Sequence, residues 1–358
     1  MRLLTAAGVF KVKTISAIGR VINSIKSCFI TILFSGNFGI YIILDYLFKE
    51  IHVMSDAILG ANIYVKRGTR AQFDAAATAG ELAASEPYFI ADEGRFAMGT
   101  SANSYATYAI ALTQDWSLYV SNTGSDSNDG LSAATAFQTI QRAVNVVRTR
   151  YLLCGYTAII NVADGTYIEN VVIGSVAGGI VRFVGSTSAI WRNTAGYLLV
   201  VTDSSAVEFS GFTLGGGGTA NGIGVRNSAF CNFQGGHVFA AMTGYHILAT
   251  RNGVCNVSGN YSIAGGSSSH YGAFDGGKIT IFSIAVTLAG TPAFTASFAL
   301  VGRVGSINGG DQVFTFSGVA TGARYGIFAN GVIWVNGKGP NVFPGSVAGS
   351  VSTGGSYS

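Results

Sequence analysis

The residues of this chain whose types and spacing could do chemistry are two carboxylates, Asp203 and Glu208. Glycoside hydrolysis needs two carboxyl groups that face one bond, one as the acid and one as the base or nucleophile. The two residues could occupy a strand edge and the adjoining turn, which makes them a candidate catalytic dyad. Between Glu169 and the C-terminus, the only other acids are Asp275 and Asp311. Because acids are so scarce, we favour ordinary solvated side chains and leave an enzymatic activity open.

A second group places a His beside a Tyr twice, 24 residues apart: Tyr245, His246, His270 and Tyr271. Stacked on neighbouring strands, such a ladder could bind a sugar by ring stacking and hydrogen bonding. It could equally be a polar column on a solvated face, which we favour. Two histidines are too few for a metal site, and we predict neither a metal nor a cofactor.

Two further pairs share the separation of 24 residues. Arg251 and Asp275 are candidates for a binding site or, as we favour, for a surface ion pair worth at most about 1 kcal/mol. Cys231 and Cys255 would lie one strand spacing apart, about 4.8 Å, which suits a disulfide. We expect stacked inward-facing thiols instead, because all cysteines, with Cys154 among them, fit free buried thiols of a reduced compartment.

Asp126, Asn128 and Asp129 form a turn cluster that suggests a calcium loop. An EF-hand loop requires a bidentate Glu at its twelfth position, where Phe137 stands. We therefore expect the side chains of the cluster to bond to their own backbone.

A repeat in the sequence positions the pairs that are 24 residues apart. Four segments start 24 residues apart: AVEFSG (206–211), FCNFQG (230–235), VCNVSG (254–259) and KITIFS (278–283). Apolar and polar residues alternate within each segment, and the apolar ones stay in register between segments, so they should face one core. The apolar columns are Val207, Cys231, Cys255, Ile279 and Phe209, Phe233, Val257, Ile281; the polar column is Glu208, Asn232, Asn256, Thr280, and the turn column Gly211, Gly235, Gly259. This pattern predicts an all-β fold, a single-stranded parallel β-helix over residues 153–345, followed by a loose tail at 346–358.

The alternative fold is a β-sandwich or propeller, whose hairpins favour Asn-Gly and Asp-Gly turns. Such dipeptides begin at Asp129, Asp164, Asn221, Asn252, Asp275 and Asn330. A sandwich would not explain the columns in register, so we favour the β-helix.

An amphipathic helix precedes the repeat. Its apolar face consists of Ile140, Ala143, Val144 and Val147. Thr135 and Gln138 have the spacing of a capping box at its start. An uncovered first coil would expose apolar side chains and unpaired backbone groups. We therefore predict that residues 116–152 form an N-terminal cap on the β-helix.

Residues 1–53 differ from the rest in composition, with positive charges before an apolar run at 28–48. The run approaches the length of a membrane span, but Asn37, Asp45 and two glycines interrupt it. We favour an over-extended start, with Met54 as the true one. A genuine membrane segment and a buried or partner-binding helix are the alternatives.

Residues 54–115 predict a small α+β adaptor. A helix should follow Thr69 and end at Gly80, and strands are expected at 63–66, 88–91 and 95–98. So small a core needs oligomerisation to complete it.

The adaptor sequence KRGTRAQFDAAATAGELAASEPYFIADEGRFAMGTSANSY resembles the N-terminal segments of bacteriophage tail-fibre and tail-spike proteins. In those proteins it belongs to the attachment and trimerisation region. The ending GARYGIFANGVIWVNGKGPNVFPGS is similar to C-terminal segments of phage tail proteins. The resemblance implies a homotrimer that contacts virion baseplate or tail proteins, located in the virion tail and made in the bacterial cytoplasm.

The sequences YVSNTGSDSNDGLSAATAFQTIQRAV and INVADGTYIENVVI resemble the opening of the pectin-lyase-like superfamily. The resemblance implies a right-handed parallel β-helix with an N-terminal capping α-helix. The catalytic motifs of the esterases, polygalacturonases and pectate lyases have no counterpart downstream, so no active site is carried over.

The net charge is only +4 and no basic stripe contains interleaved aromatics, so nucleic acid is not an expected partner. We expect a phage or prophage tail fibre or tail spike that binds a host surface polysaccharide through its β-helical shaft. The alternatives are a polysaccharide depolymerase on the same fold and a membrane-anchored surface adhesin, which requires residues 1–53 to be genuine.

Overall fold

The computed structural model describes residues 30–34, 40–44, 65–176, 178–310 and 312–358. The predicted start at Met54 lies outside these residues, as does Cys28. Within the apolar run of the N-terminal region, β1 (Ile30–Phe34) pairs antiparallel with β2 (Ile40–Leu44). The chain divides into two compact units after Thr107, whereas the sequence predicted a boundary after residue 115.

From residue 65 on, the first unit contains a four-stranded sheet and one helix, α3 (Arg70–Ala79). Its strands, in spatial order, are β3 (Lys66–Gly68), β4 (Pro87–Ile90), β5 (Arg95–Ser101) and β6 (Ser104–Thr107). As the sequence predicted, Thr69 is the N-cap of this helix and Gly80 ends it, with a φ of 81°. The structure adds that Thr69 and Gln72 form a capping box. The predicted strand at 63–66 lies partly outside the described residues, and β6 was not predicted.

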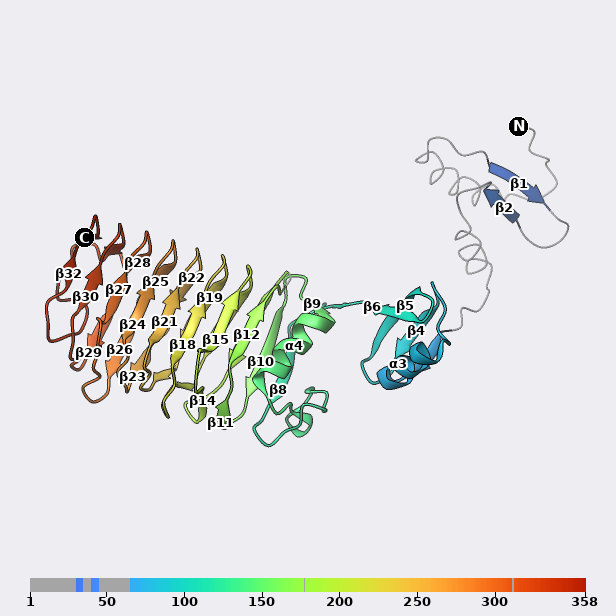
Figure 1. The fold of residues 1–358 in the computed structure, drawn as a ribbon, viewed down its shortest axis with the longest axis horizontal. Helices are drawn as coiled ribbons and strands as arrows, with labels where there is room; N and C mark the ends of the chain where they lie inside the picture. Colours follow the sequence, from blue (N-terminus) through green and yellow to red (C-terminus); the bar gives the residue numbers. More distant parts are fainter. Residues whose placement is uncertain (1–29, 35–39, 45–64, 177, 311) are drawn as a thin grey trace. The chain divides into compact units, whose positions relative to one another are not determined.

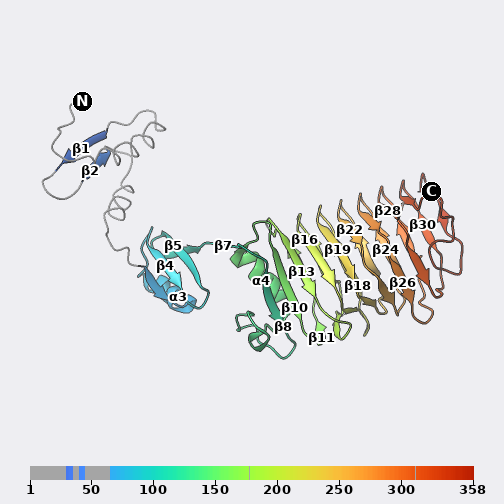
Figure 2. The same cartoon turned by 180° about the vertical axis from the view of Figure 1, so that it is seen from behind.

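The second unit is a solenoid of parallel strands that form three long sheets (Figures 1 and 2). The ten-stranded sheet contains β8 (Trp116–Val120), β10 (Thr157–Val162), β13 (Ile180–Val184), β16 (Ala206–Ser210), β19 (Phe230–Gly235), β22 (Val254–Val257), β25 (Lys278–Ile281), β28 (Ser306–Asn308), β31 (Val332–Trp334) and β33 (Ser356–Tyr357). The seven-stranded sheet contains β11 (Gly165–Ile168), β14 (Ala189–Arg192), β17 (Thr213–Leu214), β20 (Val238–Phe239), β23 (Tyr261–Ile263), β26 (Ala285–Leu288) and β29 (Thr315–Ser317). The eight-stranded sheet contains β12 (Val171–Gly174), β15 (Tyr197–Thr202), β18 (Asn221–Val225), β21 (Tyr245–Ala249), β24 (Ser269–Ala273), β27 (Ala299–Val301), β30 (Tyr325–Ile327) and β32 (Ser350–Val351).

This architecture confirms the predicted all-β fold and its parallel coils, while the right-handed sense of the coil stays a prediction. The sandwich and propeller alternatives are wrong, because the strands of the three long sheets pair in parallel. Asn252, Asp275 and Asn330, which begin three of the Asn-Gly and Asp-Gly dipeptides, have φ of 60°, 53° and 59°. These dipeptides therefore make left-handed bends between sheets and no hairpins.

The predicted columns are confirmed by the pairing of β16, β19, β22 and β25. Val207, Cys231, Cys255 and Ile279 are register partners, as are Phe209, Phe233, Val257 and Ile281. Cys231 and Cys255 are free and buried, whereas Cys154 is exposed, so the expectation that Cys154 is buried is wrong. A Cβ at Gly259 would lie 1.9 Å from the Gln234 carbonyl oxygen, which explains why this turn requires glycine.

Helix α4 (Ile140–Arg150) lies at the N-terminal end of the solenoid (Figure 1). Its buried side chains are Ile140, Ala143, Val144, Val146 and Val147, which confirms the predicted face. The N-cap is Thr139, whose Oγ1 accepts a hydrogen bond from Arg142 N at 3.1 Å. Thr135 instead ends a short 3-10 helix (Ala133–Thr135), so the predicted capping box is wrong. That α4 closes the end of the core stays a prediction. Two short strands that flank the helix in the sequence, β7 (Ile110–Ala111) and β9 (Tyr151–Leu152), pair in parallel.

Residues 346–358 are not a loose tail. β32 and β33 continue the eight-stranded and ten-stranded sheets. Tyr357 stacks on Tyr325 with ring centroids 4.2 Å apart, and its hydroxyl donates to the Gly339 carbonyl at 2.8 Å. The prediction failed because the segment is rich in Gly and Ser, yet its backbone pairs with the preceding coil.

Candidate functional site

Asp203 and Glu208 have separate structural partners. Asp203 lies in the turn after β15, where its carboxylate accepts hydrogen bonds from Thr202 Oγ1 at 3.1 Å and from Asn227 Nδ2 at 3.2 Å. Glu208, on β16, pairs with Arg182 on the neighbouring strand β13 at 2.6 Å. No contact between described residues joins the two carboxylates into the acid and base that hydrolysis needs.

The ion pair of Asp275 is formed with Arg303, so the predicted partner Arg251 is wrong. Arg303 Nε lies 2.6 Å from Asp275 Oδ1, and the guanidinium lies 5.1 Å from the centroid of the Phe274 ring. Arg303 therefore gains a carboxylate and an aromatic face together. The hydrogen bond from Arg303 is the main cause that lowers the pKa of Asp275, and the charge of Arg251 contributes less.

The predicted His/Tyr ladder lies inside the solenoid, so its expected position on a solvated face is wrong. His246, His270 and Tyr271 are each 0% exposed, whereas Tyr245 is half-buried at the surface. The Nδ1 atoms of His246 and His270 lie 2.9 Å apart, and the hydroxyl of Tyr261 lies 2.7 Å from His270 Nε2. These three buried groups cannot contact a glycan.

The bend between the seven-stranded and eight-stranded sheets explains the error. Phe239 lies on the first sheet, and its ring centroid is 5.2 Å from those of both His246 and His270. Alternation assigns a side chain to one face only within a straight strand, and near a bend successive residues can both point inward. Burial disfavours the charged imidazole, which lowers the pKa of His246 to about 3 and that of His270 well below its usual value.

The turn cluster of Asp126, Asn128 and Asp129 bonds to the backbone, in part just before α4. As predicted, Asp129 Oδ1 accepts from the nearby backbone, at 2.9 Å from Leu131 N. Asp126 reaches further and accepts from Gln138 N and Thr139 N, both at 2.9 Å. Within the described residues, no three His, Cys, Asp or Glu side chains are grouped to hold a metal ion.

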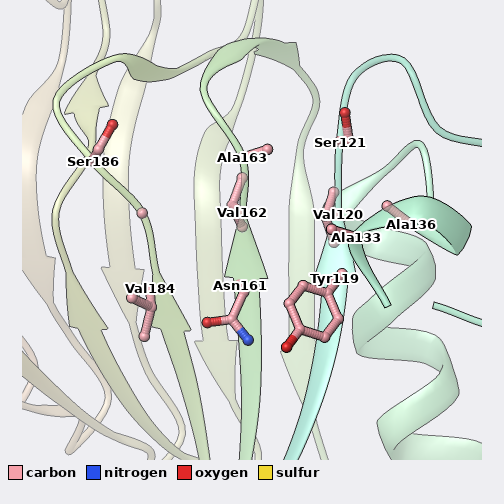
Figure 3. Close-up of a pocket in the computed structure, with 11 residues that line it drawn as sticks. Tyr119, Val120, Ser121, Ala133, Ala136, Asn161, Val162, Ala163, Val184 and Ser186 are labelled. Carbon is pink, nitrogen blue, oxygen red and sulfur yellow. The ribbon is translucent and has the colours of Figure 1, made fainter. Parts of the chain in front are cut away.

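An open recess of about 350 Å³ lies at the N-terminal end of the ten-stranded sheet. Tyr119 on β8 and Asn161 on β10 are register partners. Figure 3 shows them beside each other, with Ser121 and Ser186 where the strands turn. The described lining contains hydroxyl and amide groups but no carboxylate, imidazole or thiol. Its hydroxyl and amide groups can bind a neutral polar group.

Tyr245 keeps the accessible position that sugar stacking requires. Its ring covers Gly272, where a Cβ would lie 2.7 Å from Tyr245 Cδ1. Tyr197, which the sequence analysis did not single out, covers Gly224 in the same way, at 3.0 Å. A signal was available, because Tyr197 precedes Tyr245 by 48 residues, which is twice the repeat.

Comparison of the chain with protein-family models, curated proteins and solved structures gives no match. Over the ranges that the structure describes, no helix is both long and apolar enough to cross a membrane. A function must therefore be inferred from the solenoid, its accessible side chains and the sequence patterns.

Proposed function

We propose that the chain is a structural protein of a phage or prophage tail, a tail fibre or tail spike, that binds a host surface glycan through its solenoid. The observation that carries this proposal is the division into a small α+β unit followed by a parallel solenoid. The same order is implied by the resemblance to tail proteins. The lateral faces of a solenoid repeat at the strand spacing, which suits a polymer of repeating sugars.

The small unit suits attachment, because its own core is slight. Among the described residues, five form that core: Phe73, Leu82, Tyr88, Ile90 and Ala97. On its surface, Phe96 is 56% exposed and meets Phe89 edge to face with ring centroids 5.2 Å apart. Small cores and exposed apolar pairs favour association. The unit would thus contact virion baseplate or tail proteins and the other copies of a homotrimer.

Neither alternative function gains support from the described residues. A depolymerase would need a reacting pair, and the two candidate carboxylates have separate partners. A membrane-anchored adhesin depends on residues 1–53, most of which lie outside the described residues.

Mass spectrometry of purified phage particles tests the proposal. We expect peptides from both units in the particle, with a copy number that is a multiple of three. The full chain should also sediment as a trimer at micromolar concentration. A well-folded monomer, or absence of the chain from particles produced by the cells that express it, would overturn the proposal.

A further inference from the structure

Four aromatic residues form a row on the eight-stranded sheet, which we call the aromatic strip. They are Tyr197, Tyr245, Phe274 and Phe328. Tyr245 meets Phe274 edge to face with ring centroids 6.0 Å apart, and Phe274 lies 6.1 Å from Phe328. Tyr197 and Tyr245 begin β15 and β21, and Phe274 and Phe328 directly follow β24 and β30. These strands lie in this order along the solenoid, with β18 between the first two and β27 between the last two (Figure 1). The aromatic strip therefore runs along the stack of coils.

Glycines on the neighbouring strands leave room for the two tyrosine rings. A Cβ at Gly224 would lie 3.0 Å from Tyr197 Cδ1, and one at Gly272 would lie 2.7 Å from Tyr245 Cδ1. Each ring thus lies over a position where the sheet has no side chain. Because both tyrosines are only partly buried, they present aromatic surface on which the apolar face of a sugar can stack.

The spacing of the tyrosines suits a polymer. β18 lies between β15 and β21, so Tyr197 and Tyr245 are two coils apart. Two strand spacings amount to about 9.6 Å, comparable with the length of two pyranose rings in an extended chain. The tyrosines can therefore stack on alternate sugars of one polysaccharide.

The coil between those of Tyr197 and Tyr245 carries an arginine, Arg226. Arg226 directly follows β18, and its Nε is buried without a hydrogen-bond partner among the described residues. Burial raises the pKa of Tyr197, and the nearby charge of Arg226 opposes that rise. The two acids that follow strands of the eight-stranded sheet already have partners. Asp203 accepts hydrogen bonds from Thr202 and Asn227, and Asp275 is paired with Arg303. Arg226 therefore offers a positive charge that none of the described carboxylates pairs with.

We infer that the aromatic strip binds a carboxylated polysaccharide, with Tyr197 and Tyr245 stacking on sugar rings and Arg226 pairing with a carboxylate. Arginine matches a carboxylate with two hydrogen bonds, which are stronger than those between neutral groups. A buried arginine is costly unless a partner supplies the opposite charge, which favours a ligand that carries carboxylates. The inference rests on the proposed function and narrows its glycan to an acidic one.

Binding of the full chain to three immobilised polymers tests the inference: polygalacturonate, alginate and colanic acid. Each is used in its native form and after reduction of its carboxyl groups to alcohols. We expect at least one native polymer to bind about tenfold or more tightly than its reduced form. Arg226→Gln should remove this difference, and Tyr245→Ala should weaken binding of both forms.

Two matched variants serve as controls. Arg192→Gln removes a partly buried arginine from the seven-stranded sheet, and Trp334→Ala removes an exposed ring from the ten-stranded sheet. Neither should change binding. Thermal unfolding of each variant checks its folding, and Arg226→Gln still decides the question if Tyr245→Ala fails to fold.

The outcomes separate this inference from the function on which it rests. Equal binding of native and reduced polymers would overturn the acidic assignment and leave a glycan-binding tail protein. No binding to any of the six polymers, or a loss of self-association in Tyr245→Ala without a change in glycan binding, would overturn the aromatic strip as a glycan site. The presence of the chain in phage particles is measured independently of both.

Discussion

His246 Nδ1 and His270 Nδ1 share one hydrogen bond of 2.9 Å inside the solenoid. The Ala240 carbonyl oxygen, which can only accept, lies 3.2 Å from His246 Nε2, so Nε2 donates and Nδ1 accepts. His270 must then donate from Nδ1 and accept at Nε2 from the Tyr261 hydroxyl. That hydroxyl in turn accepts from Tyr271. The chain of hydrogen bonds is complete only while both imidazoles are neutral.

Acidification should therefore destabilise the solenoid. Burial lowers the pKa of His237 to about 4 and that of His246 to about 3, and it lowers the pKa of His270 well below 6.5. The unfolded state thus takes up protons first, so stability is complete above about pH 6.5 and is lost as the pH falls below it. We expect the free energy of unfolding in urea to fall by about 3–6 kcal/mol between pH 7.5 and pH 5.

Carboxylates do not account for a loss in this range. Burial raises the pKa of Glu169, which acts in the opposite direction as the pH falls. The lowered pKa values of Asp129 and Asp275 matter only nearer their usual value of 3.8, and that of Glu86 only nearer 4.5. A free energy of unfolding that stays constant from pH 7.5 to pH 5 would contradict the neutral histidine pair.

Glu169→Ala should weaken the start of α4. The Glu169 carboxylate accepts hydrogen bonds from Ile140 N at 2.9 Å and from Gln141 N at 3.0 Å. Its negative charge also interacts favourably with the positive end of the helix dipole. We expect a loss of about 2 kcal/mol in the free energy of unfolding at pH 7. Glu169→Gln, which keeps one acceptor, should lose less. If both variants match the wild type, the carboxylate does not hold the helix.

Val144→Asp should cause the solenoid to aggregate. Val144 is 0% exposed on the face of α4 that packs into the main core, and an unpaired buried carboxylate costs several kcal/mol. Arg148→Asp, on the exposed side of the same helix, is the control and should remain soluble. Light scattering after purification measures the difference. A soluble, folded Val144→Asp variant would show that α4 does not close the core.

The cysteines should differ sharply in reactivity. Cys154 is exposed, whereas Cys231 and Cys255 are buried and burial raises the pKa of both thiols. In a Cys28→Ser variant at pH 8, a thiol reagent should label Cys154 within minutes and the other two only after denaturation. Three labelled thiols in the native protein would contradict this burial. Two thiols that stay unlabelled in denaturant without reductant would reveal a disulfide.

The sequence predicted the stack well, because two independent periods constrain it. Alternation decides which residues of a strand face the core, and the 24-residue repeat decides which residues become partners. Both agree at Val207, Cys231 and Cys255, which are partners in the structure. A slip by one residue would have moved each of them to the outer face.

The candidate site was predicted less well, since its residues depend on bends and on distant contacts. His246 and Ile247 are adjacent, yet both are 0% exposed. Alternation alone cannot place two successive side chains in the core. Arg303 follows Asp275 by 28 residues and not by 24, because the repeat has lengthened there. A fixed period therefore selected Arg251 in error.

The ladders between coils also decide how the shaft yields to force. Their hydrogen bonds point along the stack, so tension along the shaft passes through one junction between coils after another, and the weakest junction opens first. β10 and β13 share five partner pairs, whereas β32 and β33 each hold the preceding coil by only two. A pull on the C-terminal end should thus peel off the last coil while the longer ladders near α4 stay closed. Under load, the folded part of the solenoid would lose one coil at a time before the remaining coils unfolded.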